Sequence, residues 1–440
     1  MDHKSTDILV IGGGPAGSTF GNLAAQRGWQ VTLLEKDEHP RFHIGESLLP
    51  MTLPIIERLG LGSELEKIGV RKLGADFTTI RAGAYHHSYH FKRALGDSPD
   101  HAFQVRRSEF DQMLFEKCLA MGVDARQATT VTQVEQLESG RHRVKAVDKH
   151  GVETTWEPRF LVDASGRDTF LSSSNGWKQR NPKHASAAVF AHFRGVKRRA
   201  GESEGDISIY WFQHGWVWMI PLREEITSIG AVCDPDYIKS RREPLDEFLL
   251  STINQMVGIR SRMRGAEAAT PAQATGNYSY LSDRMMGPGF LMIGDAHAFV
   301  DPVFSSGVHL AMSSAARGIN VAQAWLDGGG KMYQKACRNY QSETQRGLDT
   351  FAWFIYRFRM PAMAYLFSNP RNPFRLIEGV VSMLAGDVFS NRAVRRRLFV
   401  FKIVFAFVSL LFRLGVLNDV TSSRPRPRQE NHRPRKVASD

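Results

Sequence analysis

Hydrophobic and polar positions near the start of the chain follow a strand, helix, strand pattern. An apolar run over residues 7–11 leads into a glycine-rich turn, a helical stretch over 16–27 and a second apolar run over 30–34. Two strands joined in this way lie parallel in one sheet, with the helix against its face. Later apolar runs over 160–166 and 289–294 end in polar residues and predict two more strands of the same sheet. The predicted parallel sheet is therefore assembled from segments far apart in sequence.

The middle of the chain changes to period-two alternation, which is typical of antiparallel strands with one buried face. Such alternation covers 186–193, 206–212, 216–221 and 227–233, and from about residue 308 the pattern turns helical as far as about residue 417. The pattern predicts an α/β fold with two domains, a mostly antiparallel second sheet and a C-terminal helical cap. The expected boundaries are 5–180 with 276–345 for the first domain, 181–275 for the sheet domain, 346–420 for the cap and 421–440 for a tail.

The composition fits a folded protein with a separate basic tail. The 440 residues are 42% hydrophobic and 23% charged, which is ordinary for a globular protein. About a third of the net charge of +12 lies in the last twenty residues, where basic residues and prolines accompany almost no apolar ones. Such a segment cannot bury enough surface to become ordered, so we predict that 421–440 is a disordered, solvated tail with a potential anionic partner. Nothing else in the sequence suggests nucleic acid.

Cysteine spacing and the N-terminus predict a cytoplasmic protein. Cys118, Cys233 and Cys337 form no CxxC pair and have no histidine at metal-ligand spacing. This spacing argues against a disulfide framework and predicts no metal site. No basic and apolar leader precedes the first strand, so we expect no export signal.

The apolar stretch over 398–417 is too interrupted to span a membrane. Lys402 and Arg413 leave ten residues between them, and a membrane span needs roughly 20 apolar residues. Two interpretations remain for this predicted helix. It is buried in the cap, or it lies on a membrane surface or an acidic partner with help from the basic cluster at 392–397.

The turn after the first strand has the fingerprint of a dinucleotide site. Residues 12–17 read Gly-Gly-Gly-Pro-Ala-Gly, a GxGxxG pattern between a strand and a helix. The first glycine permits the tight turn, the second leaves room for a pyrophosphate, and the third lets helix and strand approach closely. Glu35, at the end of the second strand, is placed to accept hydrogen bonds from ribose hydroxyls. The predicted cofactor-binding residues here are Gly12, Gly14, Pro15, Ala16, Gly17 and Glu35.

Later elements decide between FAD and a nicotinamide cofactor. The apolar strand over 289–294 ends in Gly-Asp, Asp-Ala-Ser-Gly-Arg occupies 163–167, and Arg107 precedes a Phe-Asp pair at 110–111. Together with the first unit, these elements resemble the hydroxylase-like fold of FAD enzymes. The resemblance implies that Asp295 binds the ribityl and pyrophosphate arm of FAD, with Arg107 also at the cofactor.

Four further motifs indicate which kind of FAD enzyme the sequence resembles. Residues 45–50 read Gly-Glu-Ser-Leu-Leu-Pro, and Lys72 follows them in the segment 70–77. Residues 216–221 fulfil WxWxIP, and residues 299–307 fulfil FxxPxxSxG. With these motifs in this order, the sequence resembles the flavin-dependent halogenases over about residues 5–390. Period-two alternation would place Trp216, Trp218 and Ile220 on one face of a strand.

The resemblance implies an activity and its residues. Reduced FAD, supplied by a separate flavin reductase, reacts with O₂ and halide to give hypohalous acid, and a lysine directs it to an electron-rich aromatic ring. Lys72 matches that catalytic lysine, and burial could tune it between ammonium and amine. The remaining implied residues are Arg41 and Ser47 near the cofactor, Ser306 and Gly307 for halide, Gly307 also for the cofactor, and Trp216, Trp218, Ile220, Pro221, Phe299, Pro302 and Phe304 as the wall between flavin and substrate.

One departure from the family bears on the substrate. Tryptophan-type halogenases carry a carboxylate where this chain has Phe304, so free tryptophan is not the expected substrate. We expect a phenol, a pyrrole or an aromatic acyl group tethered to an acidic carrier protein, which a basic cap would suit. Two alternatives remain: a flavin hydroxylase or epoxidase, and a flavin-dependent desaturase or reductase with its basic C-terminus on a membrane.

Overall fold

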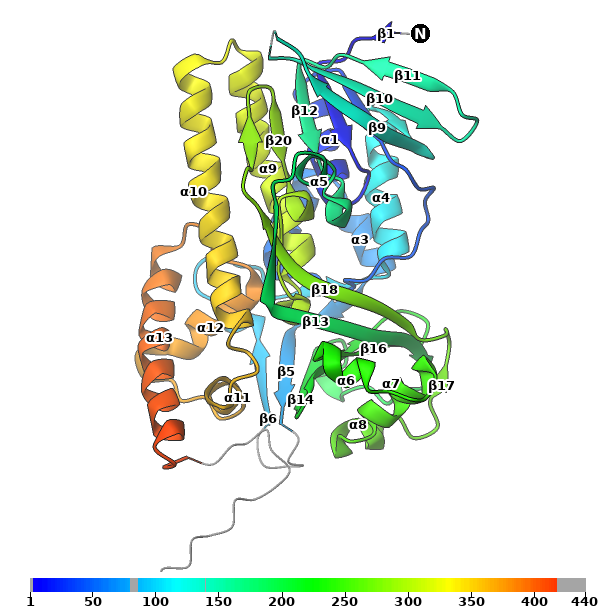
Figure 1. Ribbon diagram of the computed structural model, residues 1–440. Coiled ribbons are helices and arrows are strands. Elements are labelled where there is room, and N and C mark those ends of the chain that lie inside the picture. The colour runs from blue at the N-terminus through cyan, green and yellow to red at the C-terminus, as the bar shows by residue number, and fades with distance from the viewer. Residues whose placement is uncertain (1–2, 80–85, 139, 418–440) are drawn as a thin grey trace, which may run out of the picture.

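The computed structural model describes residues 3–79, 86–138 and 140–417 (Figure 1). Its first domain is built on a six-stranded sheet with the strand order β19-β20-β12-β2-β3-β8. The pairs within β20-β12-β2-β3-β8 are parallel, as expected for βαβ units, so segments far apart in sequence become neighbours. The strands are β2 (Ile8–Ile11), β3 (Val31–Leu34), β8 (Asp124–Arg126), β12 (Phe160–Asp163), β19 (Met286–Gly287) and β20 (Phe290–Met292).

Helices cover one face of this sheet and a small second sheet covers the other. Helix α1 (Pro15–Ala25) packs between α4 (Arg107–Ala120) and α9 (Ser306–Leu326). A buried cluster that includes Leu9 and Val144 joins the opposite face to a four-stranded sheet that the alternation pattern did not reveal. Its strands are β1 (His3–Lys4), β9 (Thr129–Gln136), β10 (His142–Asp148) and β11 (Glu153–Trp156).

A nine-stranded sheet forms the second domain. The four expected alternating segments are strands here, and β15 pairs antiparallel with both β14 and β16. The sheet reaches beyond the segment 181–275, because β5 pairs parallel with β14 and antiparallel with β6. The boundaries predicted from the sequence for the domains stay predictions. The strands are β5 (Gly74–Thr78), β6 (His86–His90), β13 (Lys178–Arg194), β14 (Ile207–Phe212), β15 (Gly215–Pro221), β16 (Ile226–Cys233), β17 (Glu267–Ala268), β18 (Gln273–Ser282) and β21 (Ala298–Phe299).

The two faces of the nine-stranded sheet have different cores. Val217 and Met219 of β15 pack toward short helices, whereas Trp216 and Trp218 point to the opposite face, where the cap lies. Trp211 joins sheet and cap, since its ring stacks on Phe358 at 4.5 Å and its Nε1 donates to the Phe358 carbonyl at 3.0 Å. The short helices are α6 (Pro235–Lys239), α7 (Leu245–Ile253) and α8 (Val257–Arg262).

The cap consists of helices that follow α9 (Figure 1). Within the described residues, no helix is long and apolar enough to cross a membrane. The predicted disordered tail at 421–440 lies outside the described residues. The cap helices are α10 (Gly330–Ile355), α11 (Pro361–Ser368), α12 (Leu376–Ala385) and α13 (Arg392–Arg413). The remaining helices and strands are α2 (Leu53–Arg58), α3 (Gly62–Ile68), α5 (Phe170–Ser174), β4 (Val70–Lys72) and β7 (Ala102–Gln104).

The packing of α1 against β2 generates a prediction about stability. A Cβ added at Gly17 would lie 1.9 Å from the Gly12 carbonyl oxygen, so Gly17→Ala must push the helix off the strand. We expect a loss of about 2–4 kcal/mol in the free energy of unfolding, measured by urea denaturation. Gly21→Ala is the matched control, because its Cβ would meet its nearest atom at an ordinary 3.4 Å. Equal stability of the two variants would contradict this packing.

Candidate active site

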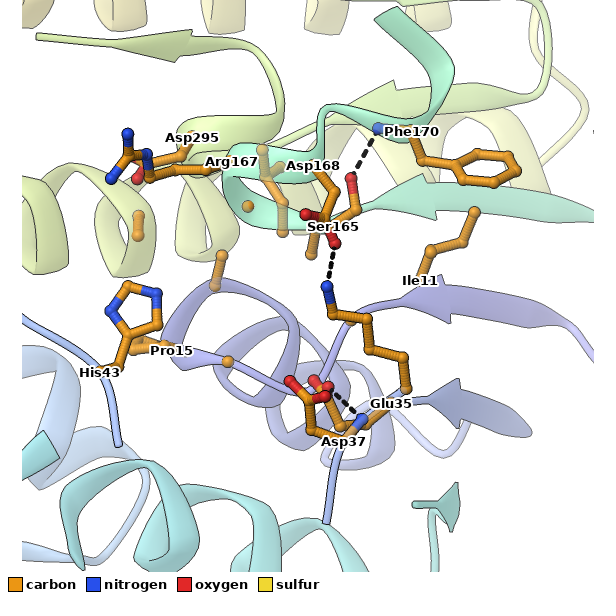
Figure 2. Close-up of a pocket in the computed structure, with 18 of the residues that line it drawn as sticks. Ile11, Pro15, Glu35, Asp37, His43, Ser165, Arg167, Asp168, Phe170 and Asp295 are labelled. Atoms are coloured by element: carbon orange, nitrogen blue, oxygen red, sulfur yellow. Dashed lines mark hydrogen bonds and ion pairs between the residues drawn. The ribbon is translucent and has the colours of Figure 1, made fainter. Parts of the chain in front are cut away.

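A cavity of about 290 Å³ opens at the carboxyl ends of the parallel strands, between the GxGxxG turn and the segment at 164–168. Glu35, buried at the end of β3, accepts hydrogen bonds from the N–H of Gly13 at 2.6 Å and of Asp37 at 2.9 Å. These bonds aim its carboxylate at the rim of the cavity. Figure 2 shows Glu35 and Asp37 on one side of this cavity and Arg167 and Asp295 on another.

The cavity fits the diphosphate and adenosine part of FAD. Gly14 carries no Cβ at the opening of α1, and the nearest atom to such a Cβ would be Arg41 Nη2 at 3.7 Å. Arg41 lines the cavity, and its buried Nε has no hydrogen-bond partner among the described residues, although the Asp37 carboxylate lies 3.6 Å away. A guanidinium with an unused donor beside a helix N-terminus suits a phosphate.

Arg107 connects this cavity to the Gly-Glu-Ser loop. Its Nε and Nη2 donate to the two carboxylate oxygens of Asp111 at 2.8 and 2.9 Å, and its Nη1 donates to the Ile44 carbonyl at 2.9 Å. Burial opposes the charge of Arg107, but the carboxylates of Asp111, Asp295 and Glu46, with Asp111 foremost, together outweigh burial and raise the pKa of Arg107. The guanidinium stays charged and holds the loop against α4.

Asp295, which the resemblance assigns to the ribityl and pyrophosphate arm of FAD, lines the same cavity. Burial raises the pKa of Asp295 to about 6, against the opposing charges of Arg167 and Arg107. The carboxylate is therefore mostly ionised at pH 7 and can accept hydrogen bonds from ribityl hydroxyls. Its main-chain carbonyl accepts a hydrogen bond from Tyr280 Oη at 2.9 Å, which fixes the turn.

A second cavity of about 120 Å³ lies beside the first, against the nine-stranded sheet. Trp216, Trp218 and Ile220 line it together, so the alternation in β15 has the predicted effect. The Trp218 Nε1 donates to Ser228 Oγ at 3.1 Å, which fixes the indole. The two cavities adjoin, because both are lined by His43, Arg107, Arg167, Asp295, Gly307 and Val308.

The loop before α9 closes this second cavity. Ser305 has a left-handed backbone with φ of 55° and forms the N-cap of α9, so the chain turns sharply there. Ser306 and Gly307 occupy the first turn of a long helix, where N–H groups lack helical partners and the dipole favours an anion. Gly307 lines both cavities, whereas Ser306 is buried beside them.

Lys72, at the end of β4, is the most unusual side chain in this region, because only 1% of it is exposed. Its Nζ donates to Ser47 Oγ at 2.9 Å and to the Leu48 carbonyl at 3.2 Å, and it lies 5.3 Å from the centre of the Phe91 ring. Ser47 is part of the wall of the second cavity. The hydroxyl group of Ser47 therefore lies between the Lys72 amine and the second cavity, which Trp216 also lines.

Burial and a carboxylate set the charge of Lys72. Burial lowers the pKa of Lys72 to about 7, and the charge of Asp206 opposes this shift. Asp206 accepts hydrogen bonds from the N–H groups of Leu73 at 2.8 Å and Gly74 at 2.7 Å, so it also fixes the backbone that follows the lysine. At neutral pH the side chain exists as both ammonium and amine.

Comparisons with known proteins agree with this geometry. The FAD-binding domain family matches residues 5–331. A 1H-pyrrole-2-carbonyl-[peptidyl-carrier protein] chlorinase of Pseudomonas fluorescens is 30% identical over 89% of this chain and 91% of its own length. The chain belongs to the flavin-dependent halogenases. The corresponding brominase of Pseudoalteromonas luteoviolacea is 35% identical over 74% of this chain and 79% of its own length.

Solved structures of halogenases share the fold. The flavin-dependent brominase Bmp2 superimposes with a TM-score of 0.81 and 28% identity, covering 91% of this chain and 99% of that one. The predicted two-domain FAD fold, the use of FAD and halide, and the membership of the halogenase family are thereby confirmed. The roles of individual residues in this halogenase stay predictions.

Most predicted site residues meet in the two cavities, but some lie elsewhere. Phe299 and Pro302 line the second cavity, whereas Pro221 and Phe304 do not. Phe304 is buried among cap aromatics, with its ring 5.3 Å from that of Phe358. Lys72 is outside the cavity lining and reaches it through Ser47.

The halogenase site also contains residues to which sequence reasoning gave no role. Arg167 lines both cavities, with its guanidinium 5.0 Å from the centre of the Phe299 ring and a hydrogen bond to Thr275 Oγ1 at 3.2 Å. His43 also lines both, and the charge of Arg107 together with burial lowers the pKa of His43 to about 4. Arg167 could have been noticed in the sequence as the basic residue of the 163–167 motif, and His43 by its place two residues before Gly45.

The buried lysine generates a prediction about stability and pH. Its pKa is about 7 in the folded state and ordinarily 10.5, so between these values the unfolded chain binds more protons and stability rises with pH, by at most about 1.4 kcal/mol per unit. Lys72→Met removes the cost of burying the ammonium. We expect it to raise the free energy of unfolding by about 2–4 kcal/mol at pH 7, with a smaller gain at pH 9, measured by urea denaturation.

Lys92→Met is the control for this measurement, because the Lys92 side chain is 66% exposed. Its stability relative to the parent protein should not change between pH 7 and pH 9. A gain from Lys72→Met that is the same at both pH values would show that the pKa of Lys72 is ordinary.

Proposed function

We propose that this halogenase modifies an electron-rich aromatic acyl group, such as a pyrrole or phenol, that is tethered to a carrier protein. We further propose that a separate flavin reductase supplies its reduced FAD and that Lys72 directs the halogen. The chemistry that FAD supplies with O₂ is the oxidation of halide to hypohalous acid. The observation that carries the proposal is the buried Lys72, hydrogen-bonded to a hydroxyl in the cavity wall.

Lys72 and the residues around it have separate proposed roles. The ammonium form can donate a hydrogen bond to hypohalous acid and polarise it. The amine form can instead take the halogen from hypohalous acid, with an N–halogen bond formed, the O–halogen bond broken and water released; a pKa near 7 keeps both forms available. N–H groups of Ser306 and Gly307 suit a halide beside the cofactor. Trp216 and Trp218 form an apolar wall that keeps the organic substrate away from the flavin.

The substrate class rests on relatives and on Phe304. Two relatives are named for pyrrole-2-carbonyl groups on a peptidyl carrier protein. In this chain Phe304 is buried among cap aromatics and supplies no carboxylate that could remove a ring proton. The one carboxylate of the FxxPxxSxG loop, Asp301, does not line the second cavity and accepts hydrogen bonds from Ser186 Oγ at 2.8 Å and from the N–H of Val303 at 3.2 Å. Pyrroles and phenols need less help in losing that proton. A cytoplasmic location, where carrier proteins and reductases are found, completes the proposal.

The direct test is halogenation with a flavin reductase, NADH, FAD, O₂ and bromide, comparing pyrrole-2-carbonyl on a carrier protein with the free acid by mass spectrometry. We expect Lys72→Ala to lower bromination by at least about 100-fold, because hypohalous acid is no longer held beside the ring. Arg71→Ala is the matched control, since the neighbouring Arg71 side chain is 61% exposed. Equal bromination by both variants would exclude Lys72 as the relay, and hydroxylation without halide would favour a monooxygenase.

Asp206 provides a separate test of the lysine's charge. Asp206→Asn keeps an oxygen that can accept from the N–H groups of Leu73 and Gly74 but removes the charge that raises the pKa of Lys72. The pKa of Lys72 should therefore fall further below 7, and the Lys72-dependent limb of the pH profile for bromination should move to lower pH. An unmoved profile would show that Lys72 ionisation does not control the reaction.

A further inference from the structure

Helix α13 has two apolar faces on opposite sides. One face packs into the cap against α11 and α12. The other, which we call the α13 stripe, is exposed to solvent, with its side chains between 49% and 67% exposed. Figure 1 shows α13 as the outermost helix of the cap. The inward face consists of Val394, Leu398, Phe401, Phe405 and Val408, and the α13 stripe consists of Phe399, Ile403, Phe407, Leu410 and Leu414.

The spacing of the α13 stripe makes it a continuous surface. Its members follow one another at intervals of three or four residues, which places them on one side of a helix. The same interval extends backward to Arg396 and Arg392, which are also exposed. A row of large apolar side chains therefore ends in two cations on the same face.

The charge of α13 has one sign. The helix carries no Asp or Glu, and four of its six basic residues lie within its first six residues. Lys402 lies with its Nζ 5.0 Å from the centre of the Trp353 ring, at the border between the buried and exposed faces. These basic residues are Arg392, Arg395, Arg396, Arg397, Lys402 and Arg413.

We infer that the α13 stripe lies on the surface of an anionic lipid bilayer, with the phenylalanines among the acyl chains and the arginines at the phosphates. An interfacial helix of this kind combines a face of Phe and Leu with Arg and Lys beside it. It lies along the membrane and does not cross it, which agrees with the absence of a spanning helix among the described residues. The inference is independent of the substrate.

Charge argues against the other occupants of this face. A second copy of α13 would bring six more cations and no anion. The basic segment 421–440 repels α13 in the same way and has few apolar residues with which to cover the α13 stripe. An acidic protein would complement the positive charge of α13. An anionic bilayer would complement this charge and would also bury the long row of exposed aromatic and aliphatic side chains.

The test is flotation of the purified full-length protein with vesicles of phosphatidylcholine alone and of equal parts phosphatidylcholine and phosphatidylglycerol. We expect binding to the anionic vesicles, weakened by salt. Phe399→Ser with Phe407→Ser should weaken this binding at least about tenfold, because two exposed aromatic side chains are lost from the interface. Arg392→Gln with Arg396→Gln should weaken it several-fold and reduce its salt dependence.

Matched controls separate the α13 stripe from general surface effects. Leu119 and Val152, 49% and 57% exposed in the first domain, are changed to Ser, and the exposed Arg242 and Arg260 to Gln; both variants should bind as the parent does. Circular dichroism checks folding. Binding that survives both α13 variants, or is lost only when the basic residues of 421–440 become Gln, would overturn the inference. So would a dimer or a carrier-protein complex that the α13 variants disrupt while no vesicle is bound.

Discussion

The burial of one lysine is the constraint on which the rest of the site depends. The Lys72 ammonium would be costly to bury if its hydrogen bonds to Ser47 and Leu48 were not in place, and both acceptors belong to the loop that Arg107 ties to α4. Asp206 fixes the two residues that follow the lysine, because it accepts hydrogen bonds from the N–H groups of Leu73 and Gly74. A residue that destabilises the fold is thus kept in one position by contacts from both domains, as expected for a functional group.

The cavities depend on one stretch of chain that passes between the domains. It leaves β20 of the first sheet, turns at Asp295, pairs as β21 with β18 of the second sheet and enters α9 at Ser305. The carboxylate predicted to bind the ribityl chain and the helix N-terminus predicted to bind halide are therefore about ten residues apart in sequence, and Asp295 and Gly307 both line the two adjoining cavities. The same stretch places Asp295 and the start of α9 next to Ser47, the hydrogen-bond partner of Lys72.

Local chemistry explains what the sequence could predict. The sequence could predict features that depend only on neighbouring residues. These features are the GxGxxG turn, Glu35 and the alternation at Trp216, Trp218 and Ile220, and the structure places them at the cavities as expected. The pairing of β5 with β14 joins residues more than a hundred positions apart, so alternation alone could not reveal it. Arg167 gains its position at both cavities only through tertiary packing. The same packing turns Phe304 away from the cavity toward Phe358, although its motif predicted a place in the wall.

The pKa of the buried Lys72 can be measured directly by a pH titration of the lysine side chains by NMR, with ¹⁵N at Nζ. One signal should titrate near pH 7 and be absent from Lys72→Met. Such a signal would establish that the site holds a lysine able to act as both ammonium and amine. If no lysine signal titrates near pH 7, Lys72 is solvated and is not a buried relay in this halogenase.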